Sequence, residues 1–346
     1  MKLKKLLVIA AAIIAIVVLV FGILLYKQIF SKNTRFSEKE IEIFVPTDAN
    51  YAQILTLVKP YIKDLSKFEW VASKKSYPEH VKSGRFIFKK DMNSNELVNA
   101  LRQNIAVDLA FNNQERLEDF AGRIGAQIEA DSLSLLKSFN DPVFLEQHHF
   151  SQETILCMFL PNSYEIFWNT SADKFRDKML AEYESFWSKE RLKKADLLGL
   201  TPIEVIILAS IVHKETNKNN ERPRVAGVYI NRLNTGMALG ADPTIIFAKK
   251  KKEHDFDQVI KRVLYDDLKL DSPYNTYTNI GLPPGPIAMP DITAIDAVLN
   301  YEKHHYLYFC ASVIRFGYHE FAENLNQHAA NRNKYVAWVN TKGIKR

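Results

Sequence analysis

One glutamate in this sequence combines the features that a general acid requires. Glu215 ends a largely apolar run that follows Thr201-Pro202-Ile203-Glu204. These four residues predict a helix start, because Thr caps the first turn, Pro fits the first helical position and Glu completes a capping box. Residues 205–212 are apolar on every side apart from Ser210, which predicts a helix buried inside a domain.

The position of Glu215 on this helix predicts a raised carboxyl pKa. Its side chain shares a helix face with Leu208 and Ile211, and it lies in the last turn, where the helix dipole opposes ionisation. Burial favours the protonated form as well, and a carboxylic acid that is protonated near neutral pH can donate a proton to a leaving oxygen. A structural role, in which Glu215 pairs with Lys214 or an arginine, fits the same pattern. His213 lies on the opposite side, where we expect it to pack rather than to act as a base.

Polar side chains further along the chain could complete a site around this acid. Segment 272–290 contains five Pro and two Gly, which predicts a stiff loop able to hold side chains in place. Its hydroxyls, amide and aromatic rings are groups that bind sugars, and they belong to Tyr274, Asn275, Thr276 and Tyr277. Each of these residues also fits a purely structural role.

Three further segments add candidate substrate contacts. Arg232 lies in the last turn of a helix expected at 221–233, and Asp242-Pro243-Thr244 predicts a turn that begins with a carboxylate. His319 lies in the second arm of a hairpin expected near the C-terminus. We therefore consider Arg232, Asp242, Thr244 and His319 as possible ligand contacts, with a structural alternative for each.

The composition excludes several functional classes. The chain has 346 residues, of which 47% are hydrophobic and 25% charged, so it can form one or two folded domains. The net charge of +6 comes partly from lysines beside an N-terminal apolar run and from the lysine tract 249–252, which we expect in a solvated loop. Because no zinc-finger, Walker or dinucleotide motif occurs, we expect no metal, no cofactor and no nucleic-acid partner. Cys157 and Cys310 predict buried small side chains or at most one disulfide.

The N-terminus predicts a membrane anchor. Residues 6–26 form an uncharged run that, as a helix, covers the roughly 30 Å hydrocarbon layer. The run is too long for a signal peptide and lacks a small-residue cleavage site, and three lysines precede it. We expect a single-pass protein of the cytoplasmic membrane, with a cytoplasmic tip and anchor at 1–30, a linker at 31–40 and extracytoplasmic C-terminal domains.

The remainder predicts an α+β protein with a small module at 41–104 and a larger mixed α/β domain at 106–346. The expected elements of the module are strands at 41–45 and 84–88 and helices at 51–65, 67–75 and 94–102, the last capped by Ser94. The larger domain is expected to begin with a strand at 106–111 and a helix at 114–127, and to end with a hairpin at 306–321 and a helix at 322–339. The small module offers no acid, base and nucleophile together, which favours a binding or spacing role.

An ordered series of motifs resembles the YceG-like, or MltG-type, family of endolytic murein transglycosylases. The motifs are the segments 208–216, 225–233, 242–244, 274–277, 281–287 and 306–309. The resemblance covers essentially the whole chain and implies a LysM-like module at 41–104 and a YceG-like catalytic domain at 106–346. It implies cleavage of the β-1,4 bond between N-acetylmuramic acid (MurNAc) and N-acetylglucosamine (GlcNAc) inside nascent glycan strands. The product would be a 1,6-anhydro-MurNAc end, which terminates glycan elongation.

The same resemblance assigns catalysis to Glu215, the second acidic residue of the family's Glu-Lys-Glu motif. The first is His213 in this chain. Asn162 and Gly240 stand where the family often has Asp and Gln, so contacts made by those two side chains do not carry over.

A lytic transglycosylase can work with one carboxyl group, whereas hydrolytic glycosidases use two that lie about 5–9.5 Å apart. In a lytic transglycosylase the C6 hydroxyl of MurNAc attacks C1 of the same sugar. One Glu donates a proton to the departing O4 and then accepts the proton of that hydroxyl. One alternative is a hydrolase with Asp242 or Glu221 as the second carboxylate. Another is a non-catalytic scaffold that binds glycan and docks on cell-wall synthases. The expected partners are peptidoglycan strands, the membrane and, for a scaffold, those synthases.

Overall fold

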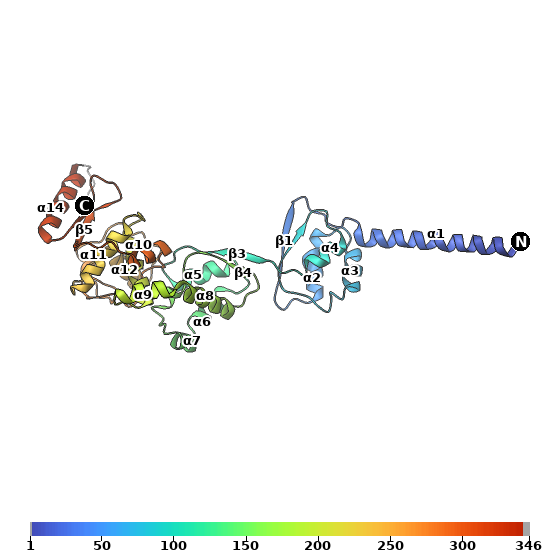
Figure 1. The fold of residues 1–346 in the computed structure, drawn as a ribbon, viewed down its shortest axis with the longest axis horizontal. Helices are drawn as coiled ribbons and strands as arrows, with labels where there is room; N and C mark the ends of the chain where they lie inside the picture. The colour runs from blue at the N-terminus through green and yellow to red at the C-terminus, as the bar shows by residue number, and fades with distance from the viewer. Residues whose placement is uncertain (1, 342–346) are drawn as a thin grey trace. The chain divides into compact units, whose positions relative to one another are not determined.

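The computed structural model describes residues 2–341 and shows a mixed α+β protein (Figure 1). Its first element, α1 (Lys2–Phe30), is a single helix whose apolar side chains are largely exposed. The helix is long enough to cross a bilayer, and its most apolar stretch has a mean hydropathy of 3.3. These properties are those of a membrane anchor, as the sequence predicts.

The contacts divide the chain into two compact units. The smaller unit holds the described residues up to Leu109, together with Gln127–Ala130 and Tyr164–Ser171. The larger unit holds Ala110–Ala126, Asp131–Ser163 and the described residues from Ala172 onward. The first division falls between Leu109 and Ala110, and two later segments return to the smaller unit.

The smaller unit is built on an antiparallel pair of strands covered by short helices. Its elements are β1 (Glu40–Val45), α2 (Tyr51–Val58), η1 (Lys59–Tyr61), α3 (Leu65–Lys74), β2 (Gly84–Lys89) and α4 (Ser94–Ala100). A further pair, β3 (Ala106–Ala110) and β4 (Ser163–Phe167), forms a second two-stranded sheet. In the first pair Ile43 lies opposite Phe86, and both side chains enter the core with Phe68 and Leu97.

Two expectations for this unit are wrong in detail. The helix expected at 51–65 ends at Val58, because Pro60 in η1 has no N–H to continue the helical hydrogen bonds. The N-cap of α4 is Asn93, whose side chain accepts a hydrogen bond from the backbone N–H of Glu96. Ser94 is instead buried within the first turn, where its hydroxyl accepts a hydrogen bond from Asn33 at 3.0 Å.

The larger unit is mainly helical and has α10 at its centre. Its first half contains α5 (Leu117–Gly125), α6 (Ser132–Phe139), α7 (Pro142–Gln147), η2 (Ile155–Met158), α8 (Ala172–Phe186), α9 (Lys189–Leu197) and α10 (Pro202–Glu215). Its second half contains α11 (Arg222–Asn234), α12 (Asp242–Glu253), η3 (Asp267–Lys269), α13 (Ile292–Leu299), the antiparallel hairpin β5 (Tyr308–Ala311) and β6 (His319–Ala322), and α14 (Leu325–Thr341). Residues 205–212 of α10 are all buried, and α11, α12 and α13 pack around this helix.

Helix α12 corrects one expectation. The turn expected at Asp242 is the first turn of this helix, because Pro243 has the fixed φ that suits a helix start. The lysine tract therefore lies in the helix rather than in a solvated loop, and Lys249 and Lys250 form ion pairs with Asp267 and Glu115.

Most other elements expected for the larger unit form with small shifts, but the strand expected at its start, β3, belongs almost entirely to the smaller unit. The Pro-rich segment contains neither helix nor strand, and the hairpin forms as expected. The last helix begins at Leu325 because Ala322 belongs to β6. Both cysteines are free thiols; Cys157 is buried, as expected, and Cys310 is partly exposed.

Candidate active site

The helix that ends with Glu215 starts as the sequence predicts. The Thr201 hydroxyl accepts a hydrogen bond from the backbone N–H of Glu204, and the Glu204 carboxylate accepts one from the backbone N–H of Thr201 at 2.8 Å. This capping box fixes the beginning of α10, and the buried turns that follow fix its end. The side chain of Glu215 is therefore carried by a rigid element rather than by a loop.

The Glu215 carboxyl is partly buried and forms a hydrogen bond with a tyrosine. The hydroxyl of Tyr229, which is 1% exposed, donates a hydrogen bond of 2.6 Å to Glu215 Oε1. Burial raises the pKa of Glu215 to about 7, and the nearby Asp242 carboxylate acts in the same direction. The hydrogen bond from Tyr229 and the charges of His319 and Arg232 oppose this shift without cancelling it. The predicted direction of the pKa shift is confirmed, and burial is its main cause.

The neighbouring lysine has a different partner. Lys214 Nζ donates a hydrogen bond of 2.6 Å to Glu115 Oε1. Because this ion pair occupies Lys214, the structural alternative in which Lys214 neutralises Glu215 is not supported. Glu215 is thus free to change its protonation state without breaking a salt bridge to this lysine.

Asp242 and Tyr277 form a second polar pair beside Glu215. The Tyr277 hydroxyl donates a hydrogen bond of 2.5 Å to Asp242 Oδ1, and both side chains are exposed. Asp242 influences the pKa of Glu215, and Glu215 influences that of Tyr277, so the three groups share one local electrostatic environment. This pair brings a carboxylate and an aromatic ring from segments about 35 residues apart to the predicted acid.

Arg232 and His319 complete the charged surroundings of Glu215. Arg232 Nε donates a hydrogen bond of 2.7 Å to the carbonyl of Leu307, and Nη1 donates to the carbonyl of Leu239. The Nδ1 atom of His319 lies 2.8 Å from Glu221 Oε2. Both side chains are therefore fixed by the protein and lower the pKa of the acid.

Glu221 is a structural anion. It is 5% exposed, and its carboxylate accepts hydrogen bonds from the His319 backbone N–H at 2.8 Å and from the Thr216 hydroxyl at 3.2 Å. Burial opposes ionisation, but the hydrogen bonds of His319 and Thr216 outweigh it and lower the pKa of Glu221. The sequence-based alternative that uses Glu221 as a second catalytic carboxylate is therefore not supported, whereas Asp242 is accessible for that role.

Four of the expected substrate contacts are buried side chains. Tyr274, Asn275, Thr276 and Thr244 are each at most 3% exposed. The Asn275 amide donates hydrogen bonds to the carbonyls of Leu268 and Leu270 at 3.0 and 2.8 Å. The hydroxyls of Thr244 and Thr276 lie 2.8 Å apart. The Asn275 amide and the hydroxyls of Thr244 and Thr276 therefore form hydrogen bonds inside the protein, whereas Tyr274 lines a cavity whose lining does not include Glu215. That these side chains bind sugar at Glu215 stays a prediction.

The hydroxyl pair nevertheless positions the site. Thr276 Oγ1 accepts a hydrogen bond of 3.0 Å from the backbone N–H of Ala241, and Thr244 Oγ1 donates one of 2.7 Å to its carbonyl. These bonds attach the first turn of α12 to the loop that carries Tyr277. Asp242 and Tyr277 consequently meet at the surface.

The structure adds Tyr229 to the site. The spacing of apolar residues along α11 predicts that the Tyr229 side chain points into the domain. Packing alone would account for this orientation, so the sequence gives no sign of a role in the site. Tyr229 comes from α11, and its hydroxyl reaches the end of α10, so only the packing of the two helices shows that it touches Glu215.

His213 lies in a separate cluster on the other side of α10. Its Nδ1 atom is 3.2 Å from both Arg222 Nη2 and Asp291 Oδ2. Burial lowers the pKa of His213, against the influence of Asp291. Residue 213 is a histidine in this chain and has no carboxylate. The carboxylate that pairs with the buried Arg222 belongs to Asp291. Among residues 2–341, no three His, Cys, Asp or Glu side chains are grouped in a way that would hold a metal ion.

The fold and the site together define a member of a known class. The model of the YceG-like family matches residues 43–334, and the chain belongs to this family, which confirms the resemblance of the motifs. A curated relative from Streptococcus pneumoniae, named endolytic murein transglycosylase, is 27% identical over 335 residues. The match covers 87% of this chain and 59% of that relative, so the chain spans about three fifths of its length.

Two further proteins match this chain over most of their own length. A relative of the same name from Bacillus subtilis is 25% identical over 350 residues, which cover 93% of this chain and 92% of the relative. The crystal structure of a yceG-like protein from Listeria monocytogenes has a TM-score of 0.56 and 26% identity, and the match covers 85% of this chain and 99% of that one.

Proposed function

We propose that this chain is an endolytic lytic transglycosylase of peptidoglycan with Glu215 as its catalytic residue. The observation that carries the proposal is a partly buried carboxyl with a pKa of about 7 at the end of a rigid helix. Such a group is half protonated near neutral pH, which suits both donation and acceptance of a proton. The names of the curated relatives from two bacteria support the same substrate class.

The reaction needs only one carboxyl group. Protonated Glu215 donates its proton to O4 of GlcNAc as the bond between this oxygen and C1 of MurNAc breaks. The C6 hydroxyl oxygen of the same MurNAc attacks C1, and its proton passes to the Glu215 carboxylate. The products are a free GlcNAc 4-hydroxyl and a 1,6-anhydro-MurNAc end, so that no water is consumed and Glu215 is protonated again.

The polar neighbours of Glu215 have separate roles in this proposal. Tyr229 positions the carboxyl through its 2.6 Å hydrogen bond. Asp242, Tyr277, Arg232 and His319 surround the acid and bind the sugar. The 2-acetamido group of MurNAc assists at C1.

The other parts of the chain bring this site to its substrate. Helix α1 holds the protein in the cytoplasmic membrane as a single span, and the lysines before it keep the N-terminus in the cytoplasm. The two units then lie outside the cytoplasm, where peptidoglycan is assembled. The smaller unit, around residues 41–104, is a LysM-like module that binds glycan.

Product analysis tests the proposal. The full chain in detergent is incubated with uncross-linked glycan strands, and the products of the wild type, Glu215→Gln and Glu146→Gln are compared by mass spectrometry. Glu215→Gln keeps the shape of the side chain but cannot donate the proton, so we expect anhydro ends to be lost, about 10²- to 10⁴-fold in rate. Glu146 is exposed on α7, and its variant should match the wild type. Undiminished anhydro product from Glu215→Gln would remove this residue from the role.

One observation favours a hydrolase as the second candidate. Asp242 is an exposed carboxylate in the electrostatic surroundings of Glu215, where a hydrolase would have its nucleophile or base. The same mass spectra distinguish the two reactions, because a hydrolytic product retains one water that the anhydro product lacks. Release of strands by the purified protein would in turn exclude a non-catalytic scaffold that docks on synthases.

A further inference from the structure

The larger unit contains a cavity that the proposed reaction does not use. Its volume is about 450 Å³, which falls in the range of pockets for small ligands. The walls come from the start of α5, the segment before η2, the C-terminal end of α12 and the Pro-rich loop. We call it the α12 pocket, and its polar lining includes Lys251, His254, Tyr274, Glu118, Gln152 and Glu153.

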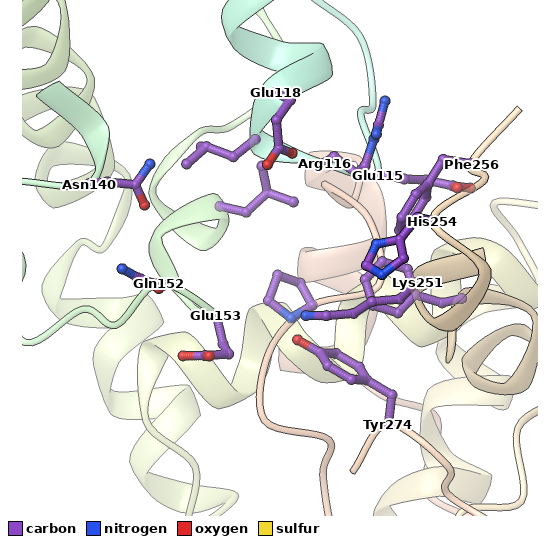
Figure 2. A pocket seen from close by; sticks show the side chains of 14 residues that line it. Glu115, Arg116, Glu118, Asn140, Gln152, Glu153, Lys251, His254, Phe256 and Tyr274 are labelled. Atoms are coloured by element: carbon purple, nitrogen blue, oxygen red, sulfur yellow. The ribbon is translucent and has the colours of Figure 1, made fainter. Parts of the chain in front are cut away.

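The α12 pocket has charges of both signs around an aromatic floor. Figure 2 shows Lys251, His254 and Tyr274 on one side, and Glu118 and Gln152 on the other. The Lys251 ammonium lies 4.9 Å from the centroid of the Tyr274 ring. A pocket with an ammonium on one side and a carboxylate on the other is complementary to a ligand that carries both charges, and it disfavours a simple anion.

Lys251 and Glu118 form no salt bridge in the described part of the chain, although Lys251, after the Ser151 hydroxyl, helps to lower the pKa of Glu153 in the same pocket. In the tract at the end of α12, Lys249 and Lys250 form ion pairs, whereas Lys251 forms none with the described residues. Glu118 likewise forms no ion pair with any residue that the structure describes. Both groups are thus available to a ligand.

Helix α12 connects the α12 pocket with the Glu215 site. Asp242, in the Glu215 site, is its first residue, and Lys251 lies nine residues later on the same helix. A helix rises 1.5 Å per residue, so these two positions are about 14 Å apart along the axis. An extended peptide spans at most about 3.3–3.6 Å per residue, so four residues cover this distance.

We propose that the α12 pocket binds the short peptide carried by the lactyl group of the MurNAc residue at which Glu215 acts. This inference rests on the proposed function, because it takes that sugar to lie at Glu215. Peptides of this kind carry free carboxylates and a free amine, and they branch from the sugar next to the bond that breaks. Lys251 and the Tyr274 hydroxyl hold a carboxylate of the peptide, and Glu118 holds its ammonium group.

Direct binding tests the inference independently of catalysis. Calorimetry measures the binding of a synthetic muramoyl tetrapeptide, whose third residue has a free side-chain amine, to the full chain in detergent. We expect binding to the wild type and roughly tenfold weaker binding to Lys251→Met and to Glu118→Gln, since each loses a charge-assisted contact. Lys252→Met is the matched control, because Lys252 is the next residue of α12, is exposed and does not line the pocket.

Two results of the binding experiment would overturn the inference. One is that the wild type does not bind the muramoyl peptide. The other is that Lys251→Met and Glu118→Gln bind it as tightly as Lys252→Met does. Both variants change exposed side chains, and these lie at opposite sides of the pocket. If one variant fails to fold, the binding measured for the other still tests the inference.

A cleavage assay separates this inference from the proposed function. Strands that carry peptides and strands stripped of them are offered in competition, and we expect Lys251→Met to reduce the wild-type preference for the former. Binding that persists in Glu215→Gln while anhydro ends are lost supports both proposals. Binding by a wild type that releases no strands supports the α12 pocket and refutes the transglycosylase. Cleavage without a preference for peptide-bearing strands refutes the α12 pocket alone.

Discussion

The Glu215 carboxyl is held between opposing influences, and their balance sets its pKa near neutrality. Burial and the Asp242 carboxylate favour the protonated acid, whereas Tyr229, His319 and Arg232 favour the carboxylate. A carboxyl group that only donated a proton would need only burial and a nearby carboxylate, which favour its protonated form. In the proposed reaction Glu215 also takes a proton back, so the stabilisation of its charged form by fixed neighbours is part of the same design.

This balance predicts the pH dependence of the reaction. The free enzyme must carry protonated Glu215, so kcat/KM should fall as the pH rises through about 7. Tyr229→Phe removes a hydrogen bond that lowers the pKa of Glu215, and the alkaline limb should therefore move to higher pH. The check is a profile of kcat/KM against pH for the wild type, Tyr229→Phe and, as a control in the smaller unit, Tyr61→Phe. An alkaline limb that stays in place or moves to lower pH in Tyr229→Phe would contradict this assignment.

The same carboxyl should also affect folding stability. Its folded-state pKa of about 7 lies above that of an unfolded Glu, about 4.3, so the native state binds a proton that the unfolded state has released between these values. The stabilisation is therefore complete below about pH 4.3 and is lost as the pH rises through 7. Relative to Glu215→Gln, the wild type should lose roughly 2 to 3 kcal/mol of unfolding free energy between pH 5 and 8.

Urea denaturation at both pH values measures this difference. Glu146→Gln, which changes an exposed side chain, should show no pH-dependent difference from the wild type. A wild type that is more stable relative to Glu215→Gln at pH 8 than at pH 5 would mean that the folded protein favours the ionised carboxylate.

At the scale of elements, α10 holds the Pro-rich loop as well as the acid. Ser210, the one polar residue in the buried turns of this helix, donates a hydrogen bond of 2.7 Å to the carbonyl of Ile207. Its hydroxyl also accepts one of 3.1 Å from the backbone N–H of Ile287 in the loop. The loop contains no helix or strand whose backbone hydrogen bonds could hold it in place. The hydrogen bond to Ser210 is therefore one of the contacts that attach the loop to the core.

Ser210→Ala should therefore destabilise the larger unit. The substitution leaves the buried N–H of Ile287 without its partner, at a cost of about 1 to 3 kcal/mol. Thermal and urea unfolding of the full chain measure this cost. Ser73→Ala serves as a matched control, because Ser73 is exposed on α3 and Ala is the better helix former. Equal stability of the two variants would show that the bond to Ile287 contributes nothing.

The elements could be predicted from the sequence where local signals act alone. The capping box of α10 and the hairpin near the C-terminus depend on neighbouring residues, and both form as expected. The helix that begins at Asp242 was expected as a turn, because Asp-Pro-Thr suits a turn and a helix start equally well. Packing of the following residues against α10 decides between the two.

The site was predictable only in part, for a related reason. Glu215 was identified from its position after an apolar face, which is a property of one helix. The roles of Thr244 and Asn275 depend on which side of the loop is buried, and the sequence does not specify this. The same residue types can bind a ligand through a hydroxyl or amide or hold a loop in place, and only tertiary contacts distinguish the two roles.

At the scale of the whole molecule, the chain combines a lipid-soluble helix with two units that bury their apolar side chains. The side chains of α1 from Leu3 onward are largely exposed, whereas Phe68, Phe86 and Phe120 in the two units are fully buried. Exposed apolar surface of this extent is unfavourable in water and stable in lipid. The hydrophobic residues of α1 therefore contribute to location rather than to the stability of either unit.

Removal of α1 should separate location from activity. A variant that lacks residues 2–30 should remain in the supernatant after carbonate extraction of membranes, whereas the full chain should sediment with them. The variant should still release anhydro ends from soluble glycan strands in vitro, because no group near Glu215 belongs to α1. Replacement of α1 by an unrelated apolar helix of the same length should restore sedimentation, since membrane insertion depends on hydropathy and length. Sedimentation of the truncated chain would show that another surface binds the membrane, and loss of its activity would show that α1 is needed to form the site.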